Sequence, residues 1–235
     1  MSAHGPEPIA EGVWVIRGGL RGGMSVFLVR DGGGVLAFDA GVASMTAQID
    51  AAARTLGGLT RVVLGHGHAD HRGAAAGLGA PVVCHPAAVA EAEGPPIPPY
   101  FRLRRLAPPV GLFYRAVLPR WGKKAPRITA TVTAGEEVGD GFTAVLLDGH
   151  APGQIALWRE RDGLALTTDV FYTVEAQTGR NCAPRLPHPA FNQDEERARD
   201  AIRHLADMDP AQAWPGHAEP VTRNVRAQLR AAAIA

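Results

Sequence analysis

The stretch His66-Gly67-His68-Ala69-Asp70-His71 follows directly on a largely apolar run at 61–64. The run is typical of a buried strand, and the six residues after it hold three imidazoles and a carboxylate. A rigid scaffold that opens into such a cluster is a common way to present a metal ion. Since His66 and His68 are two residues apart, an extended chain places both side chains on one face. The donors suit zinc, and also iron or manganese.

Other candidate ligands stand at the ends of three further apolar segments. One metal needs about four ligands, and a hydrolytic site leaves one position for water, so the stretch alone does not complete two sites. His150 follows the segment 144–147, Asp169 follows 164–168, and His217 follows 211–214. Glycine or small residues beside each of them let the backbone come close. We therefore expect these three side chains to join the cluster.

The composition is that of an ordinary globular chain. Of 235 residues, 46% are hydrophobic and 20% are charged, and the net charge of +1 gives no global reason to expect nucleic acid. No apolar run reaches the roughly 18 residues that span a membrane. The N-terminal residues lack the basic start and apolar core of a signal peptide. Two cysteines do not make a disulfide framework, so we expect a reduced, cytoplasmic protein.

Apolar segments between turn residues predict strands in both halves of the chain, each half continuing into helices. The expected strands cover 13–16, 25–30, 35–38, 61–64, 81–84, 128–133, 142–147, 154–159, 164–168 and 211–214. The expected helices cover 43–56, a short alanine-rich segment from about 72, 86–93, 194–208 and about 219–232. This order favours two sheets packed face to face with helices outside, a four-layer α/β arrangement.

Residues 94–127, which we call the insertion, interrupt this order. They include eight Lys or Arg residues and no acid, which leaves 16 basic against 23 acidic residues in the rest of the chain. Aromatic side chains such as Tyr100, Phe101 and Trp121 lie among the charges, and proline pairs predict short helices within 99–108 and 110–118. The insertion suits a substrate lid, a surface for an anionic partner, a membrane-touching element or a solvated helical hairpin that covers the core.

The motifs taken together resemble the metallo-β-lactamase-fold hydrolase superfamily. The His-x-His-x-Asp-His stretch, Gly-His-Ala-Pro-Gly at 149–153, Asp169 and Pro-Gly-His at 215–217 occur in the order of that family. Asp39 matches the acidic residue of its first motif. The resemblance covers residues from about 10 to 225. It implies a four-layer αββα sandwich and a single domain at 1–235, in which we expect the basic, aromatic insertion to be a lid.

The resemblance also implies two metal ions, which we expect to be zinc, with iron or manganese as substitutes. Such ions, about 3.5–4 Å apart, would lower the pKa of a shared water and give a hydroxide for attack on a carbonyl. Asp70 or a metal-bound water would deliver a proton to the leaving group, and Asp39 would accept an N–H from a ligating histidine. The implied ligands are His66, His68 and His150 for the first metal, Asp70, His71 and His217 for the second, and Asp169 as a bridge.

Several positions narrow the choice among members of that family. Asp rather than Cys at 169 argues against a zinc β-lactamase, and His rather than Glu at 68 argues against flavodiiron-type redox chemistry. The chain has no clear counterpart of the C-terminal glutathione-binding region of glyoxalase II. Tyr172 matches a tyrosine of acyl-homoserine lactonases of this fold and would polarise the ester or stabilise the oxyanion. Its other interpretation is an aromatic side chain packed beneath the lid.

These features predict a dinuclear hydrolase of a lactone, ester or thioester whose small substrate is acyl or anionic. The oligomeric state is open between monomer and homodimer. One alternative is a mononuclear non-haem iron persulfide dioxygenase that uses His66, His150 and Asp169. Another is a non-catalytic metal-binding module, although seven ligands exceed the four of a closed structural site. His188, in a Leu-Pro-His-Pro loop, is a further histidine that could reach the site.

Overall fold

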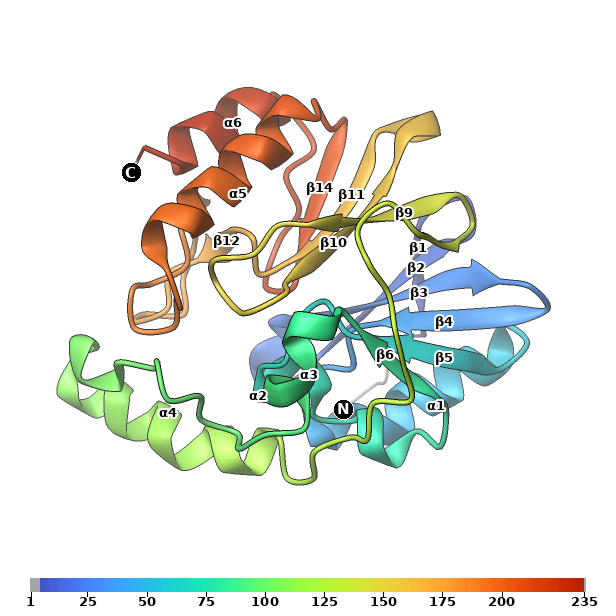
Figure 1. Cartoon of the computed structure of the whole chain (residues 1–235), viewed down its shortest axis with the longest axis horizontal. Helices are drawn as coiled ribbons and strands as arrows, with labels where there is room; N and C mark the ends of the chain where they lie inside the picture. The colour runs from blue at the N-terminus through green and yellow to red at the C-terminus, as the bar shows by residue number, and fades with distance from the viewer. Residues whose placement is uncertain (1–4, 235) are drawn as a thin grey trace.

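Two β-sheets face one another at the centre of the structure, a computed structural model that describes residues 5–234 (Figure 1). Residues 1–4, on which the signal-peptide expectation partly rests, lie outside the described range. The first sheet follows the chain order: β1 (Glu7–Ala10), β2 (Val13–Gly18), β3 (Met24–Asp31), β4 (Gly34–Phe38), β5 (Leu59–Val63), β6 (Val82–Cys84) and β7 (Ala130–Thr131). Its pairs are antiparallel from β1 to β4 and parallel from β4 to β7.

The second sheet comes from the C-terminal half. Its order is β14 (Gln212–Pro215), β11 (Leu164–Thr168), β10 (Ile155–Arg159), β9 (Phe142–Leu146) and β8 (Glu137–Gly139). β11 and β14 are parallel, and the other pairs are antiparallel. A two-stranded sheet joins β12 (Tyr172–Val174) to β13 (Asn181–Arg185).

The central strands are buried on both faces, which explains their nearly continuous apolar sequence. In β3, Phe27 and Val29 join the core between the two sheets, whereas Val26 and Leu28 point to the outer face and pack with helix residues. The Phe27 ring meets the edge of Trp214 from the second sheet at a centroid distance of 6.3 Å. Each strand therefore contributes to two layers of packing at once.

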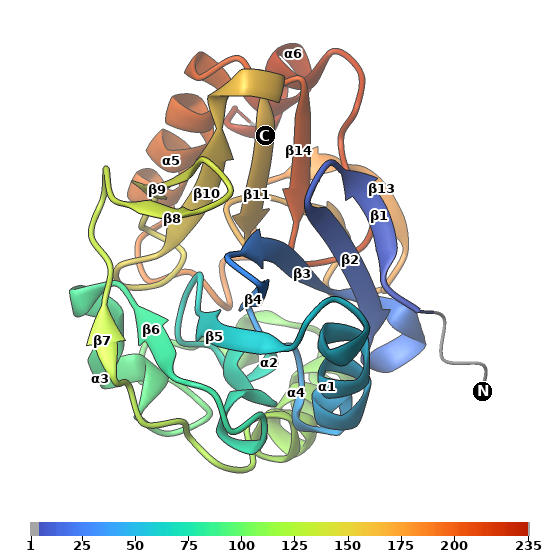
Figure 2. The same ribbon diagram turned by 90° about the vertical axis from the view of Figure 1, so that its right-hand side faces the viewer.

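Helices cover both outer faces of the paired sheets (Figures 1 and 2). α1 (Thr46–Thr55) packs on the first sheet, and α5 (Glu195–Asp207) and α6 (Val225–Ala232) pack on the second. α5 begins where the Asp194 side chain accepts hydrogen bonds from the next backbone N–H groups, a typical N-cap. The expected αββα sandwich is thus confirmed. Among the described residues, no helix is long and apolar enough to cross a membrane.

The remaining helical segments are short, apart from α4. They are η1 (Leu20–Gly22), η2 (Ala43–Met45), α2 (Ala69–Arg72), η3 (Ala75–Gly77), η4 (Pro86–Ala88), α3 (Val89–Ala92), η5 (Leu103–Arg105), α4 (Pro108–Trp121) and η6 (Glu160–Asp162). The insertion forms η5 and α4 and packs through Leu103, Leu106 and Leu118 against Ala69 and Phe191. It thus lies directly on the segment that carries the histidine stretch.

Several expected boundaries were wrong for identifiable reasons. The alanine-rich helix expected from about residue 72 is only the 3-10 turn η3, and the α-helix before it, α2, begins at Ala69 inside the histidine stretch and ends at Arg72. The last helix begins at Val225 and not near 219, because Val221 pairs with Ala213 and Asn224 has a positive φ of 47°. The first expected helix of the insertion is only η5, while α4 is longer than predicted. β1, β8, β12 and β13 were missed because they are short or lie at sheet edges.

Strand ends bring the expected ligands to one edge of the sandwich. Parallel neighbours β4 and β5 end side by side, as do β11 and β14, so the residues that follow them converge. The first sheet contributes Asp39 and the stretch 66–71, and the second contributes Asp169 and His217. His150 arrives from the loop after β9. The residues are far apart in sequence, and the facing sheets place them together.

Candidate metal centre

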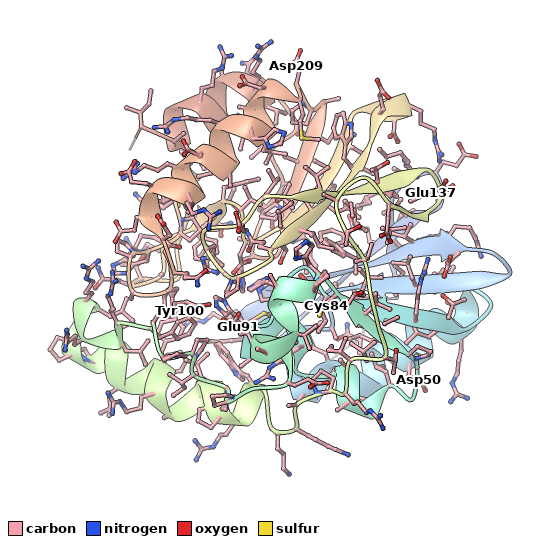
Figure 3. The ribbon with its side chains drawn as sticks, in the orientation of Figure 1. Asp50, Cys84, Glu91, Tyr100, Glu137 and Asp209 are labelled. Atoms are coloured by element: carbon pink, nitrogen blue, oxygen red, sulfur yellow. The ribbon has the colours of Figure 1, made fainter. Side chains whose placement is uncertain are left out.

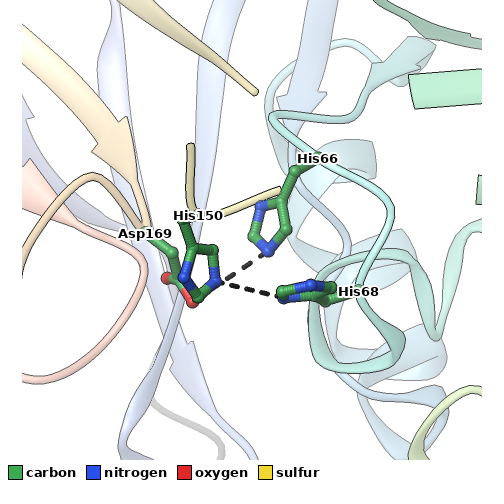
Figure 4. A group of neighbouring side chains, drawn as sticks. All are labelled: His66, His68, His150 and Asp169. Atoms are coloured by element: carbon green, nitrogen blue, oxygen red, sulfur yellow. Dashed lines mark hydrogen bonds and ion pairs between the residues drawn. The ribbon is translucent and has the colours of Figure 1, made fainter. Parts of the chain in front are cut away.

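Potential metal-binding atoms gather in neighbouring groups, each with its ligand atoms within 4.8 Å of one another. Figure 4 shows the first group, and the second lies beside it. The first group holds His66, His68, His150 and Asp169, and the second holds Asp70, His71 and His217. In a third group, Asp39 joins His66 and His71 and lies behind their rings. All seven expected ligands are therefore brought together.

His66 is oriented by a short chain of hydrogen bonds. Its Nδ1 lies 3.0 Å from the hydroxyl of Thr168, and that hydroxyl donates its only proton to Asp39 at 2.7 Å. The Thr168 oxygen must then accept from His66, which places the ring proton on Nδ1. The Nε2 lone pair consequently faces the first group.

His150 is oriented in the same way by an amide. Its Nδ1 lies 2.8 Å from Oδ1 of Asn192, whose own NH₂ donates to the Pro187 carbonyl at 2.8 Å. Because the amide is fixed by that second bond, Nδ1 of His150 is the donor. The free Nε2 of His150 lies 3.1 Å from Nδ1 of His68, inside the first group.

Asp39 lies behind the second group and makes the contact expected of it. One carboxylate oxygen lies 2.8 Å from Nδ1 of His71, and the other accepts the Gly65 N–H at 2.7 Å. This leaves Nε2 of His71 facing inward, 3.2 Å from Nε2 of His217. A carboxylate on the far nitrogen of a ligating histidine fixes the ring and raises its basicity.

Asp169 lies between the two groups. Its Oδ2 is 3.5 Å from Nε2 of His150 and 3.3 Å from Nε2 of His217, while Oδ1 is 3.3 Å from Nε2 of His71. Both oxygens of this buried carboxylate thus reach inward-facing nitrogens, one from the first group and two from the second. Asp70 is less buried and lies 3.5 Å from Nε2 of His217.

Gly216 allows the neighbouring ligand His217 to lie close to His71 and Asp169. A Cβ on Gly216 would lie 2.5 Å from a ring carbon of His71 and 2.7 Å from Oδ1 of Asp169. Any larger residue would therefore push His217 away from the group. The glycine beside this histidine has the role that we expected from the sequence.

Burial and neighbouring charges set the protonation of these side chains. Burial lowers the pKa of His66 and of His68 well below the usual range, so both rings are neutral and free to act as ligands. Burial also opposes ionisation of Asp169, but His217 and His71 outweigh it and hold the pKa of that carboxyl very low. Burial lowers the pKa of His71 as well, yet Asp169 and Asp39 together raise it well above the ordinary value.

The donor set fits metal ions by a direct test. Among the described residues, Nε2 of His66 and Oδ1 of Asp169 are buried and make no hydrogen bond. Leaving such an atom unsatisfied costs about 1–3 kcal/mol, more when it is charged. Several lone pairs converge on the same space, and a divalent cation would satisfy them together. Imidazole and carboxylate donors suit zinc, iron and manganese.

An apolar cavity of about 710 Å³ opens beside the cluster. His68, Asp70 and His217 contribute to its wall, together with the mostly buried Tyr172. The Tyr172 hydroxyl donates to Oδ2 of Asp169 at 2.9 Å. The insertion and Phe191 contribute the aromatic part of the wall, and residues from 20–24, 174–181 and 218–219 form the rest. The insertion side chains there include Phe101, Val110, Phe113, Tyr114, Leu118 and Trp121.

Some residues at the site were not predicted, and His188, which the sequence left as an open candidate, lies elsewhere. Thr168 and Asn192 hold ligand rings, and Tyr100 and Glu91 lie behind His68. Only Thr168, next to Asp169, had a position that could have suggested its role. His188 does not belong to any of the three groups, and its Nδ1 accepts the Ala190 N–H at 3.1 Å.

The sequence model of the Metallo-beta-lactamase superfamily matches residues 19–217, which contain all seven ligand positions. This chain belongs to the metallo-β-lactamase superfamily. It is 28% identical over 190 residues to the "Probable metallo-hydrolase YflN" of Bacillus subtilis (strain 168), covering 73% of this chain and 69% of that relative. The resemblance proposed from the motifs is therefore confirmed.

Solved structures of the superfamily share the fold. The metallo-beta-lactamase family protein TTHA1429 from Thermus thermophilus superposes with a TM-score of 0.65 at 20% identity, covering 97% of this chain and 78% of that chain. TTHA1623, solved in a di-iron-bound form, gives 0.61 at 23% identity, covering 87% of this chain and 92% of that chain. At these identities the likeness shows the αββα fold alone.

Proposed function

We propose that this chain is a metal-dependent hydrolase that cleaves a lactone, an ester or a thioester. The observation that carries the proposal is the carboxylate of Asp169, which lies between two groups of inward-facing ligand atoms beside an apolar cavity. A small molecule in that cavity would touch His68, Asp70 and His217 directly. The printed name of the B. subtilis relative, a probable metallo-hydrolase, supports the same class of reaction.

The chain would hold two divalent ions. When bound, such ions lower the pKa of a shared water toward neutrality and polarise a substrate carbonyl. The contribution of the protein is to orient the imidazole rings, because Thr168, Asn192 and Asp39 hold the outer nitrogens of His66, His150 and His71 and so direct the other nitrogen of each ring inward. The first ion would lie on His66, His68 and His150 and the second on Asp70, His71 and His217, with Asp169 shared.

Two side chains at the cavity wall would act on the substrate. The Tyr172 hydroxyl lies next to Asp169 and can turn to donate a hydrogen bond to the carbonyl oxygen as negative charge develops there. Asp70 is partly exposed to the cavity, so it can pass a proton to the leaving group. Both roles require only side chains that line the space where the substrate would bind.

The cavity supports an acyl substrate. Apolar side chains of the insertion form part of its wall, and we propose that the insertion acts as the lid of a single domain covering residues 1–235. An acyl chain would bury its surface there, which is favourable by about 25 cal/mol per Å² of apolar area. The carbonyl would then reach the ligand groups at one side of the cavity.

Metal analysis combined with a hydrolysis screen tests the proposal. The purified chain is loaded with zinc or with iron, and its metal content is measured with turnover of a panel of lactones, esters and thioesters. We expect two ions per chain and hydrolysis. One iron per chain with oxygen uptake on a persulfide would instead favour the dioxygenase. Metal binding without turnover of any substrate would favour a binding module.

A matched pair of histidine variants makes the metal test specific. His71→Ala removes an inward-facing nitrogen, so the metal content should fall toward one ion per chain. His204→Ala removes an exposed histidine from the outer helix α5 and should leave the metal content at two. Equal loss in both variants would mean that the measured metal is bound nonspecifically.

A further inference from the structure

The insertion reaches behind a metal ligand through Tyr100. Its hydroxyl lies 2.7 Å from Nε2 of His68 and 2.6 Å from Oε2 of Glu91, which belongs to helix α3. The ring of His68 also meets Phe101 edge-on at a centroid distance of 4.8 Å. Figure 3 shows Tyr100 and Glu91 next to each other where the insertion passes α3. The outer side of His68 is thus held by residues outside the motifs.

Counting protons sets the direction of this chain of hydrogen bonds. A tyrosine has one hydroxyl proton, and the Glu91 carboxylate can only accept. The Tyr100 proton therefore goes to Glu91, and the phenol oxygen accepts from Nε2–H of His68. That tautomer leaves the lone pair on Nδ1, which faces Nε2 of His150 at 3.1 Å within the first ligand group.

Glu91 is a buried carboxylate that lies next to both Tyr100 and His68. Its side chain is 9% exposed, and Oε1 lies 3.6 Å from Nε2 of His68. Among the described residues, Oε1 makes no hydrogen bond, and the buried Arg72 guanidinium is near enough to interact with the carboxylate electrostatically. A buried carboxylate facing the N–H side of an imidazole favours that tautomer and strengthens the opposite nitrogen as a ligand.

We infer that Tyr100 and Glu91 are positioning residues for His68, and that the insertion thereby sets the metal affinity of the first ligand group. The inference rests on the proposed function in one respect, the role of His68 as a metal ligand. The same insertion walls the substrate cavity through Phe101 and α4. Movement of the insertion would therefore change the metal site and the cavity together.

Metal affinity measured by chelator competition tests the inference without any substrate. Tyr100→Phe keeps the ring and removes the oxygen, and Glu91→Ala removes the carboxylate. Each should weaken the first metal site by about 10- to 100-fold, the usual effect of losing such a support. Because Glu91 acts mainly through the Tyr100 hydroxyl, the double variant should lose clearly less affinity than the sum of the two single losses. Glu91→Gln keeps an acceptor oxygen and should restore part of the affinity.

Tyr114→Phe is the matched control for metal binding, since its hydroxyl donates to the Ala176 carbonyl and not to a ligand. Nitrogen-15 NMR of the histidine rings gives a second measurement, in which His68 should carry its proton on Nε2 in the wild type and lose this preference in Tyr100→Phe. Unchanged affinity in Tyr100→Phe, or additive losses in the double variant, would overturn the inference. Thermal melting of each variant separates these effects from unfolding.

His68→Ala distinguishes failure of the inference from failure of the proposed function. If His68→Ala loses the first metal while Tyr100→Phe binds normally, His68 is a ligand and the positioning role is wrong. If His68→Ala itself binds both metals with wild-type affinity, the proposed ligand set is wrong as well. Loss of affinity in both variants, with Tyr114→Phe unchanged, supports both.

Discussion

The hydroxyl of Tyr172 donates a 2.9 Å hydrogen bond to Oδ2 of Asp169, the buried carboxylate that lies between the two groups of ligand atoms. The same tyrosine forms part of the cavity wall. One side chain therefore contacts both the proposed bridging ligand and the space for the substrate. Tyr172 could therefore have two roles, holding Asp169 in place and assisting the reaction, and mutation can distinguish them.

Tyr172→Phe should lower kcat by about 10- to 100-fold and leave the metal content at the wild-type value. The ring still packs in place, but a donor to the developing oxyanion is lost. Steady-state kinetics and metal analysis of the same preparations check this. If kcat is unchanged, the tyrosine is an aromatic packed beneath the insertion and takes no part in the reaction.

Asp169→Ala should remove the second metal and most of the turnover. Its two oxygens reach His71, His150 and His217, which links the two groups through one carboxylate. Metal content should fall from two ions to one or fewer per chain. Asp200→Ala, at an exposed position on α5, is the control. Wild-type turnover by Asp169→Ala would contradict a shared site.

Asp39→Asn should weaken metal binding by about 10- to 100-fold, because the neutral amide supports His71 less well than the carboxylate. Asn accepts the positive φ of 61° at this position, so the backbone is preserved. Asp39→Ala should also lower the melting temperature, because it removes the acceptor for the Gly65 N–H. Chelator competition and thermal melting measure the two effects, and equal metal affinity in Asp39→Asn and wild type would exclude the supporting role.

Metal affinity should fall as the pH is lowered, and this fall should begin at a pH above the usual titration range of histidine. Burial lowers the pKa of His71, but Asp169 and Asp39 outweigh it and raise this pKa. Below the raised pKa the metal must displace a proton, so each unit of acidification weakens binding about tenfold per proton. Calorimetry in two buffers of different ionisation enthalpy would detect this released proton. If no proton were released on metal binding near neutral pH, His71 would not be a protonated ligand that the metal must deprotonate.

Val110→Trp should narrow the cavity, because Val110 is a wall residue on α4. The KM for esters with long acyl chains should rise about tenfold or more, while short acetyl esters change little. Arg115→Trp places the same side chain on an exposed position of the same helix, outside the cavity wall, as the matched control. An equal rise for short and long esters in Val110→Trp would show that the acyl chain binds elsewhere.

Much of the fold could be predicted because its signals are local. Apolar segments such as 25–30 and 35–38 mark strands that are covered on both faces, and the Asp194 N-cap marks the start of α5. The insertion was harder to predict. Its prolines mark helix starts as well as breaks, so α4 runs through Pro119 to Trp121, where the sequence pattern predicted an earlier end.

The sequence by itself determined the ligand types, because imidazoles and carboxylates at strand ends can be read directly from their neighbours. Only the tertiary structure decided which nitrogen of each ring faces inward. Tyr100 lies 32 residues from His68, and Asn192 lies 42 residues from His150. Contacts at such separations follow from how the sheets and the insertion pack, and no spacing in the chain encodes them. The physical reason is that a hydrogen bond depends on the direction of a side chain in space, whereas a motif records only order along the backbone.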